Sequence, residues 1–142
     1  MSFRPGKILL TFCAIFQAVS PFIFDYNETH VKNPRWPPHA RFHNGQTMSM
    51  GVCLSLATLY YTWRSASSNL AARDSLRTAA VFASIYWLTG LSAILYPGTS
   101  WVDPEFGEGH PQLFIFVPFL LFPTISYVIE SNYCIVDSKK RD

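Results

Sequence analysis

Two histidines separated by one helical turn are the first residues in the sequence with a clear chemical use. His39 and His43 follow Pro37 and Pro38 in the run PPHARFH. Proline is favoured in the first turn of a helix, where its missing N–H would have no partner, so we expect a helix to begin here. Side chains four residues apart then lie on one helical face. Two imidazoles in this arrangement can share a metal ion or divide proton donation and acceptance between them.

A second pair of ionisable groups lies just upstream. Asp25 ends an apolar run, and His30 follows five residues later. A histidine beside a carboxylate at the edge of a hydrocarbon phase can accept and return a proton near neutral pH. We therefore predict that Asp25, His30, His39 and His43 carry acid–base chemistry.

The connection at 97–111 adds more polar groups, in the run WVDPEFGEGHPQ that starts at Trp101. All four histidines and five of the nine acidic residues fall in this connection and the one at 25–45. We predict that both connections lie at one end of the molecule and that seven further residues bind substrate or support the reacting groups: Asn27, Asn33, Arg35, Trp36, Arg41, Glu105 and His110.

The same residues suggest a metal site as an alternative. The ligands would be His39, His43 and one or two of His30, Asp25 and Glu105, and such nitrogen and oxygen ligands suit zinc or iron. Four histidines are too few for the multi-histidine boxes of membrane di-iron hydroxylases and desaturases. Metal-free proton transfer remains open beside the metal-assisted variant.

The elements that position these groups are predicted from the distribution of charge. Only 14% of the 142 residues are charged and 49% are apolar, whereas soluble domains are about one quarter charged. Uncharged runs recur at close to the roughly 20 residues that span a bilayer as a helix. The sequence predicts an all-α fold, a four-helix transmembrane bundle forming one integral membrane domain over 1–142. The expected spans are 8–24, 39–64, 75–96 and 112–133.

Basic residues predict the orientation of this bundle. Eight of the eleven lie in the termini and the middle connection, so the positive-inside rule places both termini in the cytosol. The connections at 25–45 and 97–111 would then face the lumen. Lys139 and Lys140 stand near the C-terminus and resemble a dilysine retrieval signal, which favours the endoplasmic reticulum. The sequon at Asn27 is too close to the first span for us to expect glycosylation.

The run D-x-N-x-T-H-x-x-N-P-x-W-P-P-H-A-R-F-H, from Asp25 to His43, resembles small four-span integral membrane proteins of filamentous fungi. These proteins are largely uncharacterised, so the resemblance implies a membrane bundle and no particular reaction. The architecture is also similar to that of sterol isomerases and small membrane cyclases, although their motifs are absent, and this likeness concerns the fold alone.

These observations favour a small endoplasmic reticulum enzyme acting on a lipophilic substrate, in lipid or secondary metabolism. Isomerisation, cyclisation or hydrolysis by proton transfer fits the candidate residues best. The alternative is a non-catalytic membrane adaptor, chaperone or lipid-binding subunit, with the motif as a rigid cap. A channel is less favoured because no charge is expected deep in the spans. The expected partners are membrane lipid or a lipophilic small molecule, with self-association left open, and the formal charge of +2 gives no reason to expect nucleic acid.

Overall fold

Four long helices make up most of the chain. The computed structural model describes residues 3–139, with side chains described as far as residue 133. Two short 3-10 turns lie between the third and fourth helices, and no strand occurs within the described range. The elements are α1 (Pro5–Phe24), α2 (Pro38–Trp63), α3 (Asn69–Ser92), η1 (Ala93–Leu95), η2 (Pro104–Phe106) and α4 (Leu113–Lys139).

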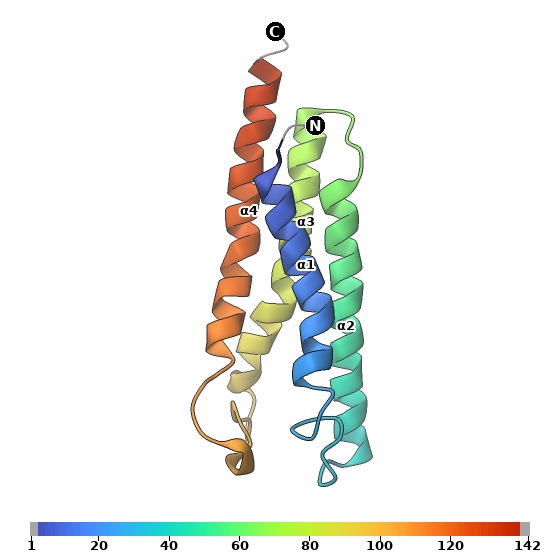
Figure 1. Ribbon diagram of the computed structural model, residues 1–142, viewed down its shortest axis with the longest axis vertical. Coiled ribbons are helices and arrows are strands. Elements are labelled where there is room, and N and C mark those ends of the chain that lie inside the picture. The colour runs from blue at the N-terminus through green and yellow to red at the C-terminus, as the bar shows by residue number, and fades with distance from the viewer. Residues whose placement is uncertain (1–2, 140–142) are drawn as a thin grey trace.

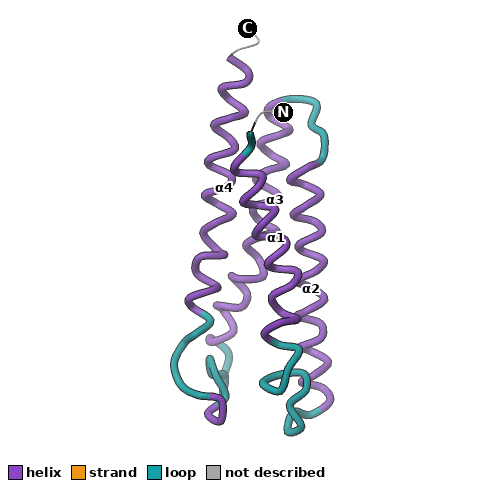
Figure 2. The backbone as a smooth tube through the Cα atoms, in the orientation of Figure 1, coloured by secondary structure: helices purple, strands orange, loops and turns teal. Residues whose placement is uncertain are grey.

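The helices form an up-and-down bundle in which neighbours along the chain run antiparallel (Figure 1). α1 packs against α2 and α4, α3 packs against the same two helices, and α1 and α3 also touch across the bundle. The N-terminal end of α1, the C-terminal end of α4 and the α2–α3 connection lie at one end. The two longer connections lie at the other end (Figure 2). The expected all-α fold is therefore confirmed, and so is the expected grouping of the two polar connections.

Three segments are long and apolar enough to cross a membrane: Pro5–Phe24, Asn69–Leu95 and Leu113–Tyr133. Much of their large apolar surface faces outward, as a hydrocarbon solvent requires. Side chains exposed on these helices include Phe12, Ile15, Val81, Leu88, Leu121 and Ile125. The buried core between them contains many small or aromatic residues, such as Ala79, Ala83, Trp87 and Phe119. This pattern indicates a membrane protein.

α2 is as long as its neighbours but is less apolar, and it is not among these three segments. In its C-terminal half, several polar side chains turn inward. Ser55, Thr58 and Thr62 are almost fully buried, and each donates a hydrogen bond of 2.7–2.9 Å to the carbonyl four residues earlier. Hydroxyls satisfied in this way can lie inside a bundle without another partner. The outward side chains of α2 include Leu56, Tyr60 and Trp63.

α1 and α4 approach most closely near Gly6. A Cβ atom at this position would lie 2.5 Å from the Ser126 carbonyl oxygen and 2.6 Å from Glu130 Cβ. The Glu130 side chain is fully buried and forms an ion pair with Arg4, with Nε 3.0 Å from Oε1. Its other oxygen accepts a 3.3 Å hydrogen bond from the Lys7 backbone N–H. A buried charge thus stands near the end of the fourth helix, where the sequence analysis gave it no role.

α3 begins ahead of its apolar run because Ser68 caps it. The Ser68 hydroxyl accepts a hydrogen bond from the Ala71 N–H at 3.1 Å, which satisfies one of the N–H groups left open at a helix start. The connection from α2 to α3 is therefore only five residues long, 64–68. The predicted retrieval signal at the C-terminus lies outside the described residues, apart from the Lys139 backbone that ends α4.

Candidate functional site

The predicted pairing of His39 and His43 is present in the first turns of α2. Pro37 precedes the helix and Pro38 begins it. The two Nε2 atoms are 3.0 Å apart, with ring planes nearly perpendicular and centroids 4.4 Å apart. Both side chains are exposed. The pair therefore stands on the outside of the bundle end, not within it.

The neighbours of this pair fix its hydrogen atoms. The Gln46 carboxamide oxygen lies 3.2 Å from His43 Nδ1, and because that oxygen can only accept, Nδ1 carries a hydrogen. Nε2 of neutral His43 is then the acceptor, so the His39 Nε2 donates to it. A proton taken up at one end of the pair could leave at the other.

Asp25 and His30 form a second pair, at the C-terminal end of α1. The Asp25 backbone N–H closes the helix on the Pro21 carbonyl at 2.8 Å. Partial burial raises the pKa of the Asp25 carboxyl above its ordinary value of 3.8, while the His30 charge and a hydrogen bond from the Asn44 side chain act in the opposite direction. The carboxyl also interacts electrostatically with Tyr86 of α3. Asp25, at the end of α1, is therefore within electrostatic range of groups on both α2 and α3.

His30 is oriented by the turn that follows α1. The Thr29 hydroxyl donates to Asn27 Oδ1 at 2.7 Å and lies 2.7 Å from His30 Nδ1. Because the hydroxyl has used its only hydrogen, the His30 Nδ1 must donate to it, which leaves Nε2 of the neutral ring as a proton acceptor. The ring edge of His30 also packs against Trp36, with centroids 5.3 Å apart.

Asn27 has a structural part in the same turn. Its amide group donates to the Phe24 carbonyl at 2.9 Å and caps the last turn of α1. Its carbonyl oxygen accepts the Thr29 backbone N–H at 2.8 Å. Both ends of the side chain are thus used within the turn.

The two polar connections touch through Asn33, Arg35 and Glu105. Arg35 forms an ion pair with Glu105, and the Asn33 amide donates to the same carboxylate at 3.4 Å. Asn33 is only 1% exposed, and its Oδ1 accepts the Arg35 backbone N–H at 2.9 Å. Arg41 of α2 donates to the Asn33 carbonyl at 2.7 Å. These residues hold the end of the bundle together.

His110 lies apart from the other histidines. Its ring contacts Trp101, with centroids 5.7 Å apart, and the structure gives it no hydrogen bond to His30, His39 or His43. Among the described residues, neither a hydrogen bond nor a ring contact joins the His39–His43 pair to the Asp25–His30 pair. The predicted residues therefore form two pairs at one end of the bundle.

The proposed metal ligands do not converge on one point. Within the described residues, no three histidine, cysteine, aspartate or glutamate side chains come together in a metal-binding arrangement. His39 and His43 remain as a two-nitrogen pair, which could bind a metal only with further ligands from solvent or another molecule.

Sequence reasoning missed several polar groups in the bundle interior. Gln17 of α1 is fully buried, and neither atom of its carboxamide has a hydrogen-bond partner. The indole N–H of Trp87, 1% exposed, and the Asn44 carbonyl oxygen also lack partners. A carboxamide inside the uncharged run 8–24 was the available signal, because a polar group buried in a spanning helix is costly unless it is bonded.

A protein-family model matches residues 9–141, and the chain therefore belongs to a family of unknown function, DUF6640. No curated protein and no solved structure matches the chain.

Proposed function

We propose that this member of a family of unknown function is a four-span membrane enzyme that transfers protons on a lipophilic substrate. The observation that carries the proposal is the position of Asp25. This half-buried carboxyl interacts electrostatically with His30 and Tyr86 and accepts a hydrogen bond from the Asn44 side chain, and it lies at the end of a helix that is apolar enough to cross a membrane. Perturbed carboxyl groups of this kind are common at active sites.

The fourth span in this proposal is α2. Its neighbours α1 and α3 are both long and apolar enough to cross a membrane, and α2 packs along each of them in the opposite direction. Its buried hydroxyls bond to their own helix, so in the C-terminal half of α2 these polar groups are not exposed to lipid. The likeness to small membrane proteins of filamentous fungi supports the same architecture.

The orientation of the bundle in the membrane is proposed from the distribution of its basic residues. Arg4, Lys7 and Arg64 lie at the termini end of the bundle together with the α2–α3 connection. A cytosolic position for this end follows from the positive-inside rule. The Asp25 end would then be luminal, and we propose a membrane of the endoplasmic reticulum as the location.

The chemistry would divide between the two pairs. One of Asp25 and His30 removes a proton from the substrate while the other returns one, which is the requirement for isomerisation or for cyclisation. Hydrolysis would use the same base to activate water. The His39–His43 pair would exchange protons with solvent, since both rings are exposed. In a metal-assisted variant, zinc or iron would use these two nitrogens and complete its ligands from water and substrate.

Replacing the proposed reacting carboxyl is the direct test. Lipid extracts would be compared from cells that express wild type, Asp25→Asn and, as a matched control, Asp103→Asn on the other connection. We expect one lipophilic product to be present with wild type and the control and absent with Asp25→Asn, while all three proteins purify as folded species. If the extracts from wild type and Asp25→Asn do not differ, the proposal that the protein is an enzyme that uses Asp25 is wrong.

The second candidate function is a non-catalytic adaptor or lipid-binding subunit. The Arg35–Glu105 ion pair and the two hydrogen bonds made by buried Asn33 favour it, because they show that part of the motif serves to fix the bundle end. In that case His39→Ala and His43→Ala would lower expression or detergent stability. An enzyme with the same substitutions would stay folded and lose turnover.

A further inference from the structure

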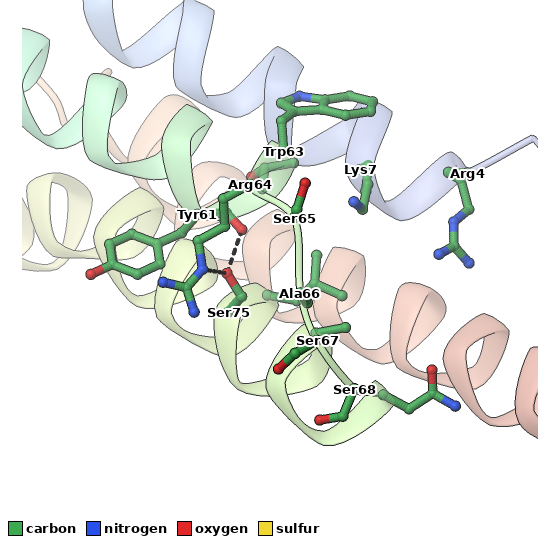
Figure 3. A pocket seen from close by; sticks show the side chains of 14 residues that line it. Arg4, Lys7, Tyr61, Trp63, Arg64, Ser65, Ala66, Ser67, Ser68 and Ser75 are labelled. Carbon is green, nitrogen blue, oxygen red and sulfur yellow. Dashed lines mark hydrogen bonds between the residues drawn. The ribbon is translucent and has the colours of Figure 1, made fainter.

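A polar pocket lies at the opposite end of the bundle from Asp25 and the histidines. It has a volume of about 360 Å³, within the range of about 300–1,000 Å³ typical of small-molecule sites. The start of α1, the end of α2, the α2–α3 connection and the first turns of α3 enclose it. Figure 3 shows Arg4 and Lys7 on one side of the connection, Arg64 on the other, and Ser65, Ser67 and Ser68 along it.

The charge of this pocket has one sign. Arg4, Lys7 and Arg64 line it, and no aspartate or glutamate does so among the residues whose side chains the structure describes. Glu130 of α4 neutralises the charge of Arg4 through their ion pair. The structure describes no carboxylate partner for Lys7 or Arg64. Lys7 lies over the Trp63 ring, 5.2 Å from its centroid. The Arg64 side chain donates from Nε to the Ser75 hydroxyl at 2.8 Å and lies over the Tyr61 ring, 5.1 Å from its centroid. Among the described side chains, the charges of Lys7 and Arg64 are therefore not neutralised by a carboxylate.

Neutral donors complete the lining. Three serine hydroxyls stand along the connection, and α3 begins at Asn69 with N–H groups that a helix cannot satisfy internally. The Ser68 hydroxyl accepts a hydrogen bond from the Ala71 N–H. The backbone N–H groups of Asn69 and Leu70, the first two residues of α3, are therefore left to bind a ligand. Cations, hydroxyls and a helix N-terminus around one cavity are the groups that bind phosphate.

The position of the pocket favours one source of phosphate. Tyr61 and Trp63, which line it, are aromatic residues at the end of a helix that packs between two candidate membrane spans. Tyrosine and tryptophan concentrate at the level of lipid headgroups. Basic side chains alone would serve the positive-inside rule anywhere on this surface, whereas here they surround a cavity.

We propose that the pocket formed by Lys7, Arg64 and the Ser65–Ser68 connection binds the phosphate of an anionic lipid headgroup. This site is independent of the proposed chemistry at Asp25, because it lies at the other end of the bundle and shares no residue with it.

The test uses the full-length protein in a neutral detergent. Short-chain dihexanoyl phosphatidic acid and phosphatidylserine would be titrated, with dihexanoyl phosphatidylcholine and inorganic phosphate as comparison ligands, and Kd would be measured by native mass spectrometry. We expect the anionic lipids to bind wild type more tightly than phosphatidylcholine, with affinity that falls as salt is added. Lys7→Gln and Arg64→Gln should each weaken binding about five- to tenfold.

Arg73→Gln is the matched control. Arg73 lies in the first turns of α3, which also contribute to the pocket, but its own side chain does not line the pocket. It should leave Kd unchanged. Inorganic phosphate that binds as tightly as the lipids and displaces them would identify free phosphate as the ligand of the same site. Wild type without a preference for anionic lipid, or an equal loss in Arg73→Gln, would overturn the proposal. The wild-type comparison decides the question even where a pocket variant does not fold.

Discussion

At the scale of single residues, Asp25 affects both the stability of the fold and the proposed reaction. Burial of a carboxyl penalises its charged form, so the raised pKa of Asp25 means that the ionised side chain destabilises the fold. The bundle tolerates this cost at the C-terminal end of α1. Destabilising groups that persist in this way are a feature of reactive sites, where the same penalty makes a carboxylate a better base.

Asp25→Asn should therefore change how stability depends on pH. The folded state binds the proton more tightly than the unfolded state, so stability is greatest below the ordinary value of 3.8 and falls as pH rises through the raised pKa of Asp25. The amide has no such loss, and we expect Asp25→Asn to melt at a higher temperature than wild type at neutral pH. Melting curves in detergent from pH 4 to 7.5 measure the difference. A difference independent of pH would contradict this account.

The His39–His43 pair makes a separate prediction about metals. Two Nε2 atoms 3.0 Å apart on one helical face can turn toward a shared zinc ion. Zinc at one hundred times its Kd would then stabilise the fold by about 2.7 kcal/mol. The rise in melting temperature should vanish in His39→Ala and in His43→Ala, and should persist in His110→Ala, because His110 lies apart from the pair. A rise that survives both single substitutions would show that zinc binds elsewhere.

At the scale of helices, the crossing of α1 and α4 depends on the absence of one side chain. Gly6 faces backbone atoms of α4 that a Cβ would approach to 2.5 Å, closer than either rigid helix allows. Gly45 of α2 has nothing within 4 Å of the same position. The two glycines are therefore a matched pair, both helical, with opposite surroundings.

Gly6→Ala should lower the free energy of unfolding by about 1–3 kcal/mol through overpacking. Gly45→Ala should raise it by about 0.5–1 kcal/mol, because alanine loses less conformational freedom in a helix. Denaturant or thermal unfolding of the purified protein in one detergent compares the two. If Gly6→Ala is as stable as wild type, the α1–α4 crossing is not as close as described.

The helices themselves were predictable, and the contacts between them were not. Uncharged runs predicted four helices because a spanning segment must exclude charge over its whole length, and the spacing of His39 and His43 predicted their pairing because it depends on one helix alone. The approach of Asn44 and Tyr86 to Asp25 depends on how three helices rotate against each other. The spacing of apolar residues within one helix does not predict that rotation. Glu130 was missed for the same reason, because its partner Arg4 lies at the start of a different helix.

At the scale of the whole molecule, the number of spans decides where the ends lie. Three spans would put the two termini on opposite sides of the membrane, and four would put them on the same side. The antiparallel bundle, with the start of α1 and the end of α4 at one end, predicts four.

Reporter tags at the N-terminus and the C-terminus should therefore show equal protection from protease in sealed membrane vesicles. A cysteine placed in the 97–111 connection should show the opposite accessibility to a membrane-impermeant reagent. Tags protected unequally would mean that α2 does not cross.

The contact of Arg35 and Asn33 with Glu105 also has a consequence for synthesis. The ribosome completes the α1–α2 hairpin before Glu105 exists, so the first half of the protein must wait in the membrane with the carboxylate partner of Arg35 still missing. Docking of the second hairpin supplies that carboxylate. The contact between the two connections can therefore form only after the second connection has been synthesised, so it reports that the two hairpins have docked.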